Sequence, residues 1–113
     1  MREMETGIET SEARSESRIS ATGRLVIESS PRFRASLTNA IGAATSAVLV
    51  IDLSALSYLD TSGVATLLEG ARIASAQGIR LRVIGLNGEP RMLAMTAELD
   101  CIFRAYGSDL ELT

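Results

Sequence analysis

The chain contains no histidine, no lysine and no tryptophan, and its one cysteine is Cys101. All 11 basic residues are arginines. These absences exclude a histidine general base, a Ser-His-Asp triad, a Schiff-base lysine and a P-loop lysine. A single cysteine also excludes an internal disulfide and a zinc site built from several cysteines. Carboxylates, hydroxyls, arginines and one thiol remain, so we expect a chain without enzymatic activity, cofactor or metal.

Aromatic residues and surplus positive charge are also scarce. The 113 residues include two Phe and two Tyr, and 46% of the chain is hydrophobic, which predicts one domain with an aliphatic core. The net charge is 11 − 14 = −3 and the arginines are scattered, which disfavours nucleic acid as a partner. The longest apolar stretch, residues 40–51, is shorter than the roughly 20 residues that span a bilayer. We therefore expect a cytoplasmic protein without direct membrane insertion.

Strand and helix patterns alternate along residues 17–113. Helices are predicted from about Pro31 to Ala44, where Ser29 and Ser30 give an N-cap signal, from Asp60 to Gly78, and from Pro90 onward. Strands are predicted at residues 18–27, 47–53, 79–84 and 102–106, and the second of them reads as a buried, central, parallel strand. The polar residues 1–16 form either a weak edge strand or a frayed tail. This order predicts an α/β fold, in which about three helices cover a mixed sheet of four to five strands and a short C-terminal stub follows from Ser108 onward.

Five further side chains receive simple structural interpretations. Cys101 lies beside the predicted strand at residues 102–106, so we expect a buried, inert thiol. Met92 and Met95 are expected to fill the core. The alternation at residues 79–84 places Arg80 and Arg82 on a solvated strand face.

The most informative segment is Asp60-Thr61-Ser62-Gly63, which follows the strand that ends at Asp52-Leu53. Capping of the next helix is one sufficient explanation, because Asp is a good N-cap residue and Gly63 permits close packing. The longer pattern supports a second explanation. Leu49-Val-Ile-Asp-Leu-Ser54, the connector Ala55–Leu59 and Asp60-Thr-Ser-Gly63 resemble the STAS family, in its anti-sigma factor antagonist type. Gly23-Arg-Leu25 is similar to that family's glycine-bearing strand, and the likeness runs over about residues 17–108.

This resemblance implies a single STAS-like domain that acts by partner switching. It implies that a GHKL-type anti-sigma factor with serine/threonine kinase activity binds the unphosphorylated domain and phosphorylates Thr61, with Ser62 as the alternative acceptor, and that a phosphatase reverses the step. Asp52, Asp60 and Gly63 would shape the signature turn. The implied partner interface comprises Gly23, Arg24, Leu25, Thr61, Ser62 and Val64, and a homodimer remains open.

Two other functions remain as alternatives. Some STAS domains with Thr at the acceptor position are subunits of lipid-transport ABC systems, so the chain could be an adaptor that binds the ATPase of such a system and needs no phosphorylation. A small-ligand or nucleotide-binding module is the third alternative, although the absence of lysine and histidine speaks against it.

Overall fold

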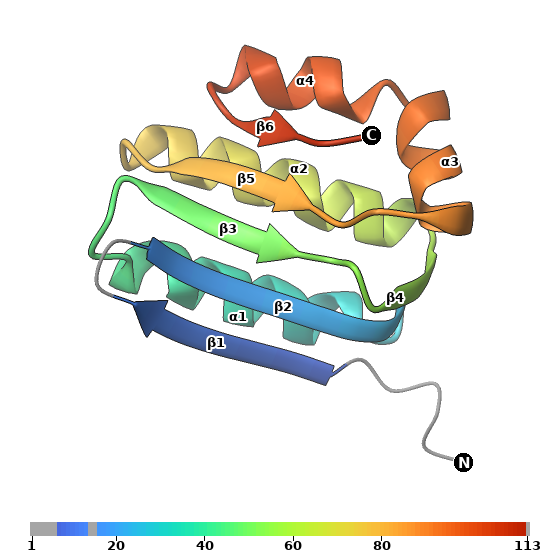
Figure 1. The fold of residues 1–113 in the computed structure, drawn as a ribbon, viewed down its shortest axis with the longest axis horizontal. Coiled ribbons are helices and arrows are strands. Elements are labelled where there is room, and N and C mark those ends of the chain that lie inside the picture. Colours follow the sequence, from blue (N-terminus) through green and yellow to red (C-terminus); the bar gives the residue numbers. More distant parts are fainter. Residues whose placement is uncertain (1–6, 14–15, 113) are drawn as a thin grey trace.

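Strands and helices alternate along almost the whole chain in the computed structural model, which describes residues 7–13 and 16–112. Over these residues the elements are, in order, β1 (Gly7–Ala13), β2 (Glu16–Leu25), α1 (Ser30–Ala43), β3 (Val48–Asp52), β4 (Leu56–Leu59), α2 (Thr61–Ala76), β5 (Arg80–Ile84), α3 (Gly88–Thr96), α4 (Leu99–Ala105) and β6 (Asp109–Leu110) (Figure 1). The predicted α/β class is confirmed.

The sheet is mixed, as expected, and its strand order is β1-β2-β3-β5-β6. β1 pairs antiparallel with β2, whereas β2, β3, β5 and β6 run parallel to one another. The short strand β4 pairs with the end of β2, with Arg24 opposite Tyr58 and Leu25 opposite Leu59. The predicted central parallel strand is β3, which lies between β2 and β5.

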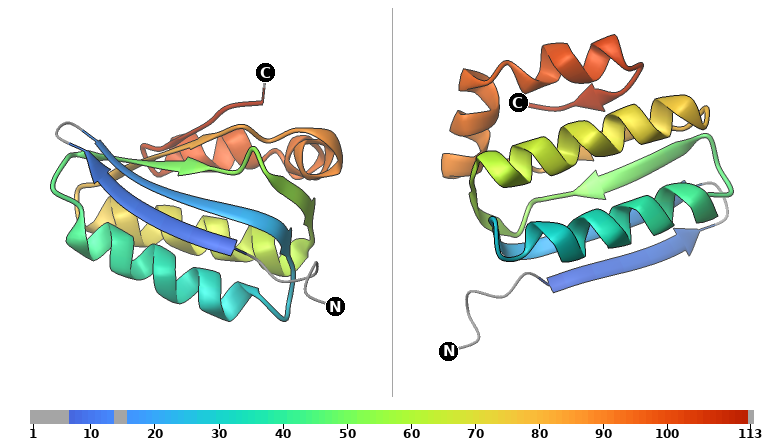
Figure 2. Two further views of the ribbon diagram at one scale, coloured as in Figure 1. Left: turned by 60° about the horizontal axis from the view of Figure 1, so that its bottom comes forward. Right: turned by 180° about the vertical axis from the view of Figure 1, so that it is seen from behind.

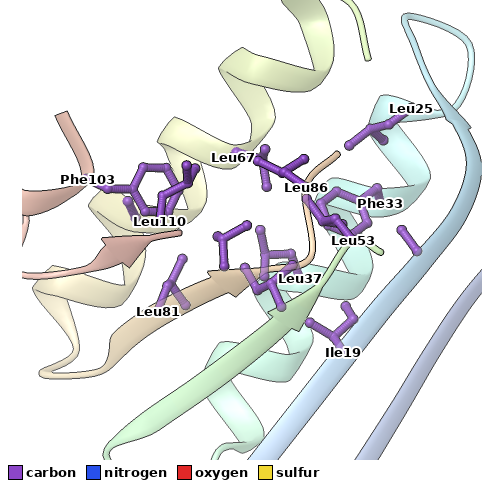
Figure 3. Close-up of a cluster of buried hydrophobic side chains, with 14 of the residues drawn as sticks. Ile19, Leu25, Phe33, Leu37, Leu53, Leu67, Leu81, Leu86, Phe103 and Leu110 are labelled. Atoms are coloured by element: carbon purple, nitrogen blue, oxygen red, sulfur yellow. The ribbon is translucent and has the colours of Figure 1, made fainter. Parts of the chain in front are cut away.

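Helices α1 and α2 cover one face of this sheet (Figure 2). Large aliphatic side chains and two phenylalanines fill the space between helices and sheet, including Ile19, Phe33, Leu37, Leu67, Leu81 and Phe103 (Figure 3). This is the aliphatic core that the composition predicts, with Phe33 and Phe103 as its only fully buried aromatic rings among the described residues. None of the described helices is long and apolar enough to cross a membrane.

The opposite face of the sheet is polar and carries ion pairs. Arg18 pairs with Asp52 at 3.0 Å, and Arg82 pairs with Glu111 at 2.8 Å. Val50 lies between Arg18 and Arg82 in the strand register and is only 3% exposed. The aliphatic stems of flanking arginines can cover an apolar side chain in this way while their charged ends stay in water. The predicted solvated face of Arg80 and Arg82 is confirmed, since both are exposed.

The strand predicted at residues 102–106 is wrong, because these residues belong to helix α4 and the turn after it. The buried residues of α4 are Leu99 and Phe103, whose spacing of four is helical, while Ile102 is 37% exposed. The last strand is instead β6, within the predicted C-terminal stub. The expectation that Cys101 is buried is also wrong, since its side chain is exposed on α4.

Further expectations need correction. Met92 and Met95 are 65% and 47% exposed on α3, because that helix turns Pro90 and Ala94 inward instead. Ser29 is the N-cap residue of α1, as predicted, but its side chain makes no capping hydrogen bond to the helix. Its hydroxyl closes the preceding turn, donating to the Arg24 carbonyl at 2.8 Å and accepting from the Val26 N–H at 3.0 Å.

The N-terminal residues were predicted as an edge strand or a tail. The structure has the edge strand β1 at Gly7–Ala13, and residues 1–6 of the predicted segment lie outside the described residues. The division of the chain at residue 16 stays a prediction.

Candidate functional site

The residues of the Asp60–Gly63 turn lie at one edge of the sheet. The parallel strands β2, β3 and β5 all end at this edge, and α1, α2 and α3 begin there (Figure 1). In open parallel sheets this edge, beyond the carboxyl ends of the strands, is the usual location of binding sites.

Asp60 holds the turn together through its carboxylate. Its Oδ1 accepts the Gly63 N–H at 3.0 Å, which makes Asp60 the N-cap of α2, and also accepts the Ser62 hydroxyl at 2.6 Å. Its Oδ2 accepts the Ile27 N–H at 3.1 Å, from the turn between β2 and α1. The capping prediction is therefore confirmed, and the same side chain also joins two segments that are far apart in the sequence.

These hydrogen bonds determine the charge state of Asp60. Burial raises the pKa of its carboxyl, but the bonds from the Ser62 hydroxyl and from the backbone N–H groups of Gly63, Ile27 and Ser62 outweigh burial. The net pKa of Asp60 lies below its usual value. A negative charge therefore stands beside the start of α2, where it complements the helix dipole.

Thr61 and Ser62 differ in accessibility although they are neighbours. Thr61 is the first residue of α2 and its side chain is exposed. Ser62 is half-buried, and besides its bond to Asp60 its Oγ lies 3.2 Å from the Oγ of the buried Ser30. An incoming group therefore reaches the hydroxyl of Thr61 more easily than that of Ser62.

Gly63 lies in the first turn of α2 and packs against the end of β2. A Cβ atom at this position would lie 2.7 Å from the Leu25 carbonyl oxygen and 2.5 Å from Leu59 Cδ1. The same Leu25 carbonyl accepts the Asp60 N–H at 3.2 Å. Only glycine permits this contact, which holds the turn that carries Thr61 against the end of β2.

The other predicted interface residues are half-buried or fully buried. Gly23 adopts a φ of 82° at an irregularity in the β2–β4 pairing, a conformation that favours glycine. The Arg24 guanidinium lies 4.6 Å from the centroid of the Tyr58 ring. The Leu25 side chain is completely buried, so it belongs to the core and cannot touch a partner, and Val64 is half-buried.

Asp52 is separate from the turn in its contacts. Its Oδ1 accepts the Ser54 N–H at 2.9 Å and its Oδ2 accepts from Arg18. Hydrogen bonds from the Ser54 backbone and side chain, followed by the charge of Arg18, lower the pKa of Asp52 despite its partial burial. Asp52 thus stabilises the start of the β3–β4 connection, and its link to the site is indirect.

Sequence reasoning missed the residues that surround Thr61 from other segments. Tyr58, Leu59, Glu89 and Leu93 line a hollow of about 420 Å³ together with Asp60 and Thr61, which we call the α3 hollow. Ile27, on the other side of Asp60, is 67% exposed. No motif marks these positions, because the fold brings them together from β4, α3 and the β2–α1 turn.

The described residues contain no group of three or more Asp, Glu, Cys or His side chains that could hold a metal ion. The site therefore offers an exposed hydroxyl, a fixed carboxylate and an apolar surround.

Comparison with protein families gives a match to the model described as "Mlab, STAS domain", over residues 8–110. A comparison with curated protein sequences gives no match.

Several solved structures share the fold. The anti-sigma factor antagonist SpoIIAA in its unphosphorylated form is 19% identical, with a TM-score of 0.72 over 93% of this chain and 88% of that one. The phosphorylated form of SpoIIAA from Bacillus has a TM-score of 0.66 and 19% identity, over 93% of this chain and 91% of that one. An anti-sigma factor antagonist from Mycobacterium paratuberculosis has a TM-score of 0.74 and 19% identity, over 96% of this chain and 86% of that one. RsbS from Moorella thermoacetica has a TM-score of 0.71 and 22% identity, over 94% of this chain and 86% of that one.

Proposed function

This chain belongs to the STAS-domain family, and on that basis we propose that it is an anti-sigma factor antagonist that regulates transcription by partner switching. In its unphosphorylated form it binds a GHKL-type kinase that is also an anti-sigma factor, and the sigma factor is released. Phosphorylation of Thr61 ends that binding, and a phosphatase restores it. All of this takes place in the cytoplasm, and the chain acts as a binding domain without catalysis of its own.

The observation that carries this proposal is the exposed Thr61 side chain on a rigid turn. Asp60 fixes the turn through three hydrogen bonds, and Gly63 packs it against the backbone of β2. A hydroxyl held in this way is pre-positioned for a kinase. Ser62 is the less suitable acceptor, because its hydroxyl already bonds to Asp60.

The chemistry of the modification fits a local switch. A phosphoryl group adds about −1.5 to −2 charges at neutral pH. At the start of α2 it lies at the positive end of the helix dipole, so the domain stays folded. The new charge stands beside Asp60 and in the hollow that Glu89 also lines. A partner surface shaped for a neutral hydroxyl then meets a bulky dianion, and binding is lost without a large change of shape.

The similar structures support this reading. Two of them carry the name anti-sigma factor antagonist, and SpoIIAA has the same fold in an unphosphorylated and a phosphorylated form. The comparison at 19–22% identity shows the fold, and the role of Thr61 in this chain is our inference.

A second candidate function has one specific observation in its favour. The matching family model is described as "Mlab, STAS domain", and some STAS domains with Thr at the acceptor position serve lipid-transport ABC systems. In that case the surface around Thr61 forms a constitutive interface with the transporter ATPase, and no phosphate is needed.

Paired affinity capture tests the two candidates. Wild-type protein, Thr61→Glu and Thr61→Ala serve as baits in a lysate of the source organism, and mass spectrometry identifies the retained proteins. Partner switching predicts that wild type and Thr61→Ala retain a GHKL-type kinase and that Thr61→Glu does not. A kinase retained equally by Thr61→Glu contradicts the switch. An ABC ATPase retained on the baits, with no phosphate ever found on the protein from cells, replaces it with the adaptor function.

A further inference from the structure

Three of the large hydrophobic side chains that remain exposed belong to the segments around Thr61. Among the described residues, six side chains of this kind are exposed: Ile27, Tyr58, Met92, Met95, Ile102 and Tyr106. The backbone of Ile27 bonds to Asp60, Tyr58 lines the α3 hollow, and Met92 adjoins Leu93 of the same hollow. Exposed apolar side chains gathered in one place mark interaction surfaces.

The Asp60–Gly63 turn stands as a ridge between two hollows. The α3 hollow lies on one side and is lined by Tyr58, Thr61, Glu89 and Leu93, among others. On the other side is a hollow of about 380 Å³ between α1 and α2, with Ile27, Pro31, Ser62 and Ala65 in its lining. The exposed hydrophobic residues Ile27 and Tyr58 therefore line different hollows, on opposite sides of the proposed switch residue.

The charge of the α3 hollow is one-sided. Its lining includes two carboxylates, Asp60 and Glu89, and none of the described residues that line it is basic. Both carboxylate oxygens of Asp60 already accept hydrogen bonds, Oδ1 within the turn and Oδ2 from the Ile27 N–H. Glu89, exposed in the first turn of α3, is thus the carboxylate that a partner's cation can approach.

We propose that these two hollows and the ridge form one docking surface for an amphipathic, basic segment of the partner protein. Apolar side chains of that segment pack on Ile27, Tyr58 and Met92, and an arginine or lysine enters the α3 hollow and pairs with Glu89. This inference rests on the proposed function, because it names the surface that the anti-sigma kinase contacts. Methionine suits such a surface, since its flexible, polarisable side chain adapts to the partner.

The same arrangement explains how phosphorylation of one hydroxyl is sufficient to prevent partner binding. A phosphoryl group on Thr61 projects into the α3 hollow, which is lined by Thr61 itself. It fills the space that the partner's basic side chain needs, so the apolar contacts on both sides of the ridge can no longer form together.

Site-specific photo-crosslinking tests the position of the surface. A photoreactive amino acid replaces Ile27, Met92 or Tyr106 in turn, and the kinase retained by wild-type protein is the binding partner used. Tyr106 on α4 is the matched control, because it is 37% exposed, as Tyr58 is, and it lies near Arg72 in the later part of α2. We expect kinase crosslinks from Ile27 and Met92 and none from Tyr106, with the crosslinked kinase peptide containing apolar residues and Arg or Lys.

Affinity measurements with the same kinase test the energetics. Met92→Ser and Tyr58→Ser should each weaken binding about tenfold, whereas Tyr106→Ser leaves it unchanged. Glu89→Arg should also cost about tenfold, and Glu89→Gln should reduce the dependence of binding on salt concentration. Met92 is 65% exposed, so its replacement does not endanger the fold.

The outcomes separate this inference from the proposed function. Suppose that the kinase binds wild type but not Thr61→Glu. If it then crosslinks only to the probe at Tyr106, or if the crosslinked kinase peptide is acidic, the proposed docking surface is wrong although the switch at Thr61 stands. If the crosslinks join two copies of this chain, a homodimer occupies the surface and the inference is again wrong. If no kinase binds wild type at all, the proposed function fails, and the inference fails with it.

Discussion

Gly63 shows how one missing side chain positions the site. The close approach of α2 to β2 leaves no room for a Cβ atom, because the backbone oxygen of Leu25 would lie 2.7 Å from it. A backbone atom cannot move aside as the end of a flexible side chain can. The turn that presents Thr61 therefore depends on glycine at this position for a steric reason.

Gly63→Ala should destabilise the domain by about 1–3 kcal/mol, the usual cost of forcing extra volume into a packed interior. Gly42→Ala is the matched control, because Gly42 also lies in a helix but a Cβ there would meet nothing within 4 Å. The control should be stabilising by about 0.5–1 kcal/mol, since alanine favours a helix over glycine. Urea unfolding of both variants measures the difference, and equal effects would contradict the steric argument.

Glu98 is the one residue other than glycine with a positive φ among the described residues. It joins α3 to α4 with φ 52° and ψ 41°, in the left-handed region. A side chain with a Cβ pays about 1–2 kcal/mol for this conformation.

Glu98→Gly should therefore raise the free energy of unfolding by about 0.5–1 kcal/mol, once the greater flexibility of glycine in the unfolded chain is subtracted. Glu98→Ala keeps the Cβ and should give no such gain. Both are measured by urea unfolding, and a stabilising effect of Ala as large as that of Gly would assign the gain to the lost charge instead.

The start of α2 is stabilised by an ionised Asp60. Because the folded-state pKa of Asp60 lies below its value in the unfolded chain, this stabilisation is complete above the unfolded pKa of about 3.9. It is lost as the pH falls from that value through the folded-state pKa.

Asp60→Asn removes the charge but keeps a good N-cap residue. At pH 7 the variant should be less stable than wild type, and the gap should narrow as the pH drops below about 4. Thermal unfolding of both proteins between pH 7 and pH 2 measures this. A gap that stays constant over the whole range would contradict the role of the Asp60 charge.

The helices that the sequence predicts best are those in which apolar residues at helical spacing follow a helix-start signal such as proline. Helix α1 was expected at about 31–44 and lies at Ser30–Ala43, because its apolar residues repeat at helical spacing after a proline. Where α4 lies, the sequence predicts a strand, because the Leu99–Ala105 helix is short and its Ile-Phe pair resembles a strand pattern. Only tertiary packing, which buries Leu99 and Phe103 together, decides for the helix.

The site follows the same division. The Asp60–Gly63 turn was predictable, since capping and close packing are local properties of consecutive residues. Ile27, Tyr58 and Glu89 were not, because their place beside Thr61 results from the order of strands in the sheet. Leu25 was assigned to the interface from its motif, and the alternation of β2 turns its side chain into the core instead.

The residues that stabilise the fold and those of the candidate site lie in different parts of the molecule. The core lies between the sheet and helices α1 and α2, while the candidate site lies at the edge where the parallel strands end (Figures 1 and 2). Changes at the exposed Thr61 should therefore affect binding without affecting folding.

Thr61→Glu tests this separation. Its free energy of unfolding should stay within about 0.5 kcal/mol of wild type, as expected for an exposed position. Circular dichroism and urea unfolding measure it. A variant that loses its structure would mean that loss of partner binding reports unfolding instead of a switch.

The central claim is that Thr61 is the phosphorylated switch residue. Its most direct test is phosphopeptide mapping of this protein purified from cells of the source organism across growth and stress conditions. We expect one phosphoryl group on Thr61, none on Ser62, and an unmodified fraction that alone binds the kinase. Phosphate confined to Ser62, or a protein that stays unmodified under every condition, would contradict the claim.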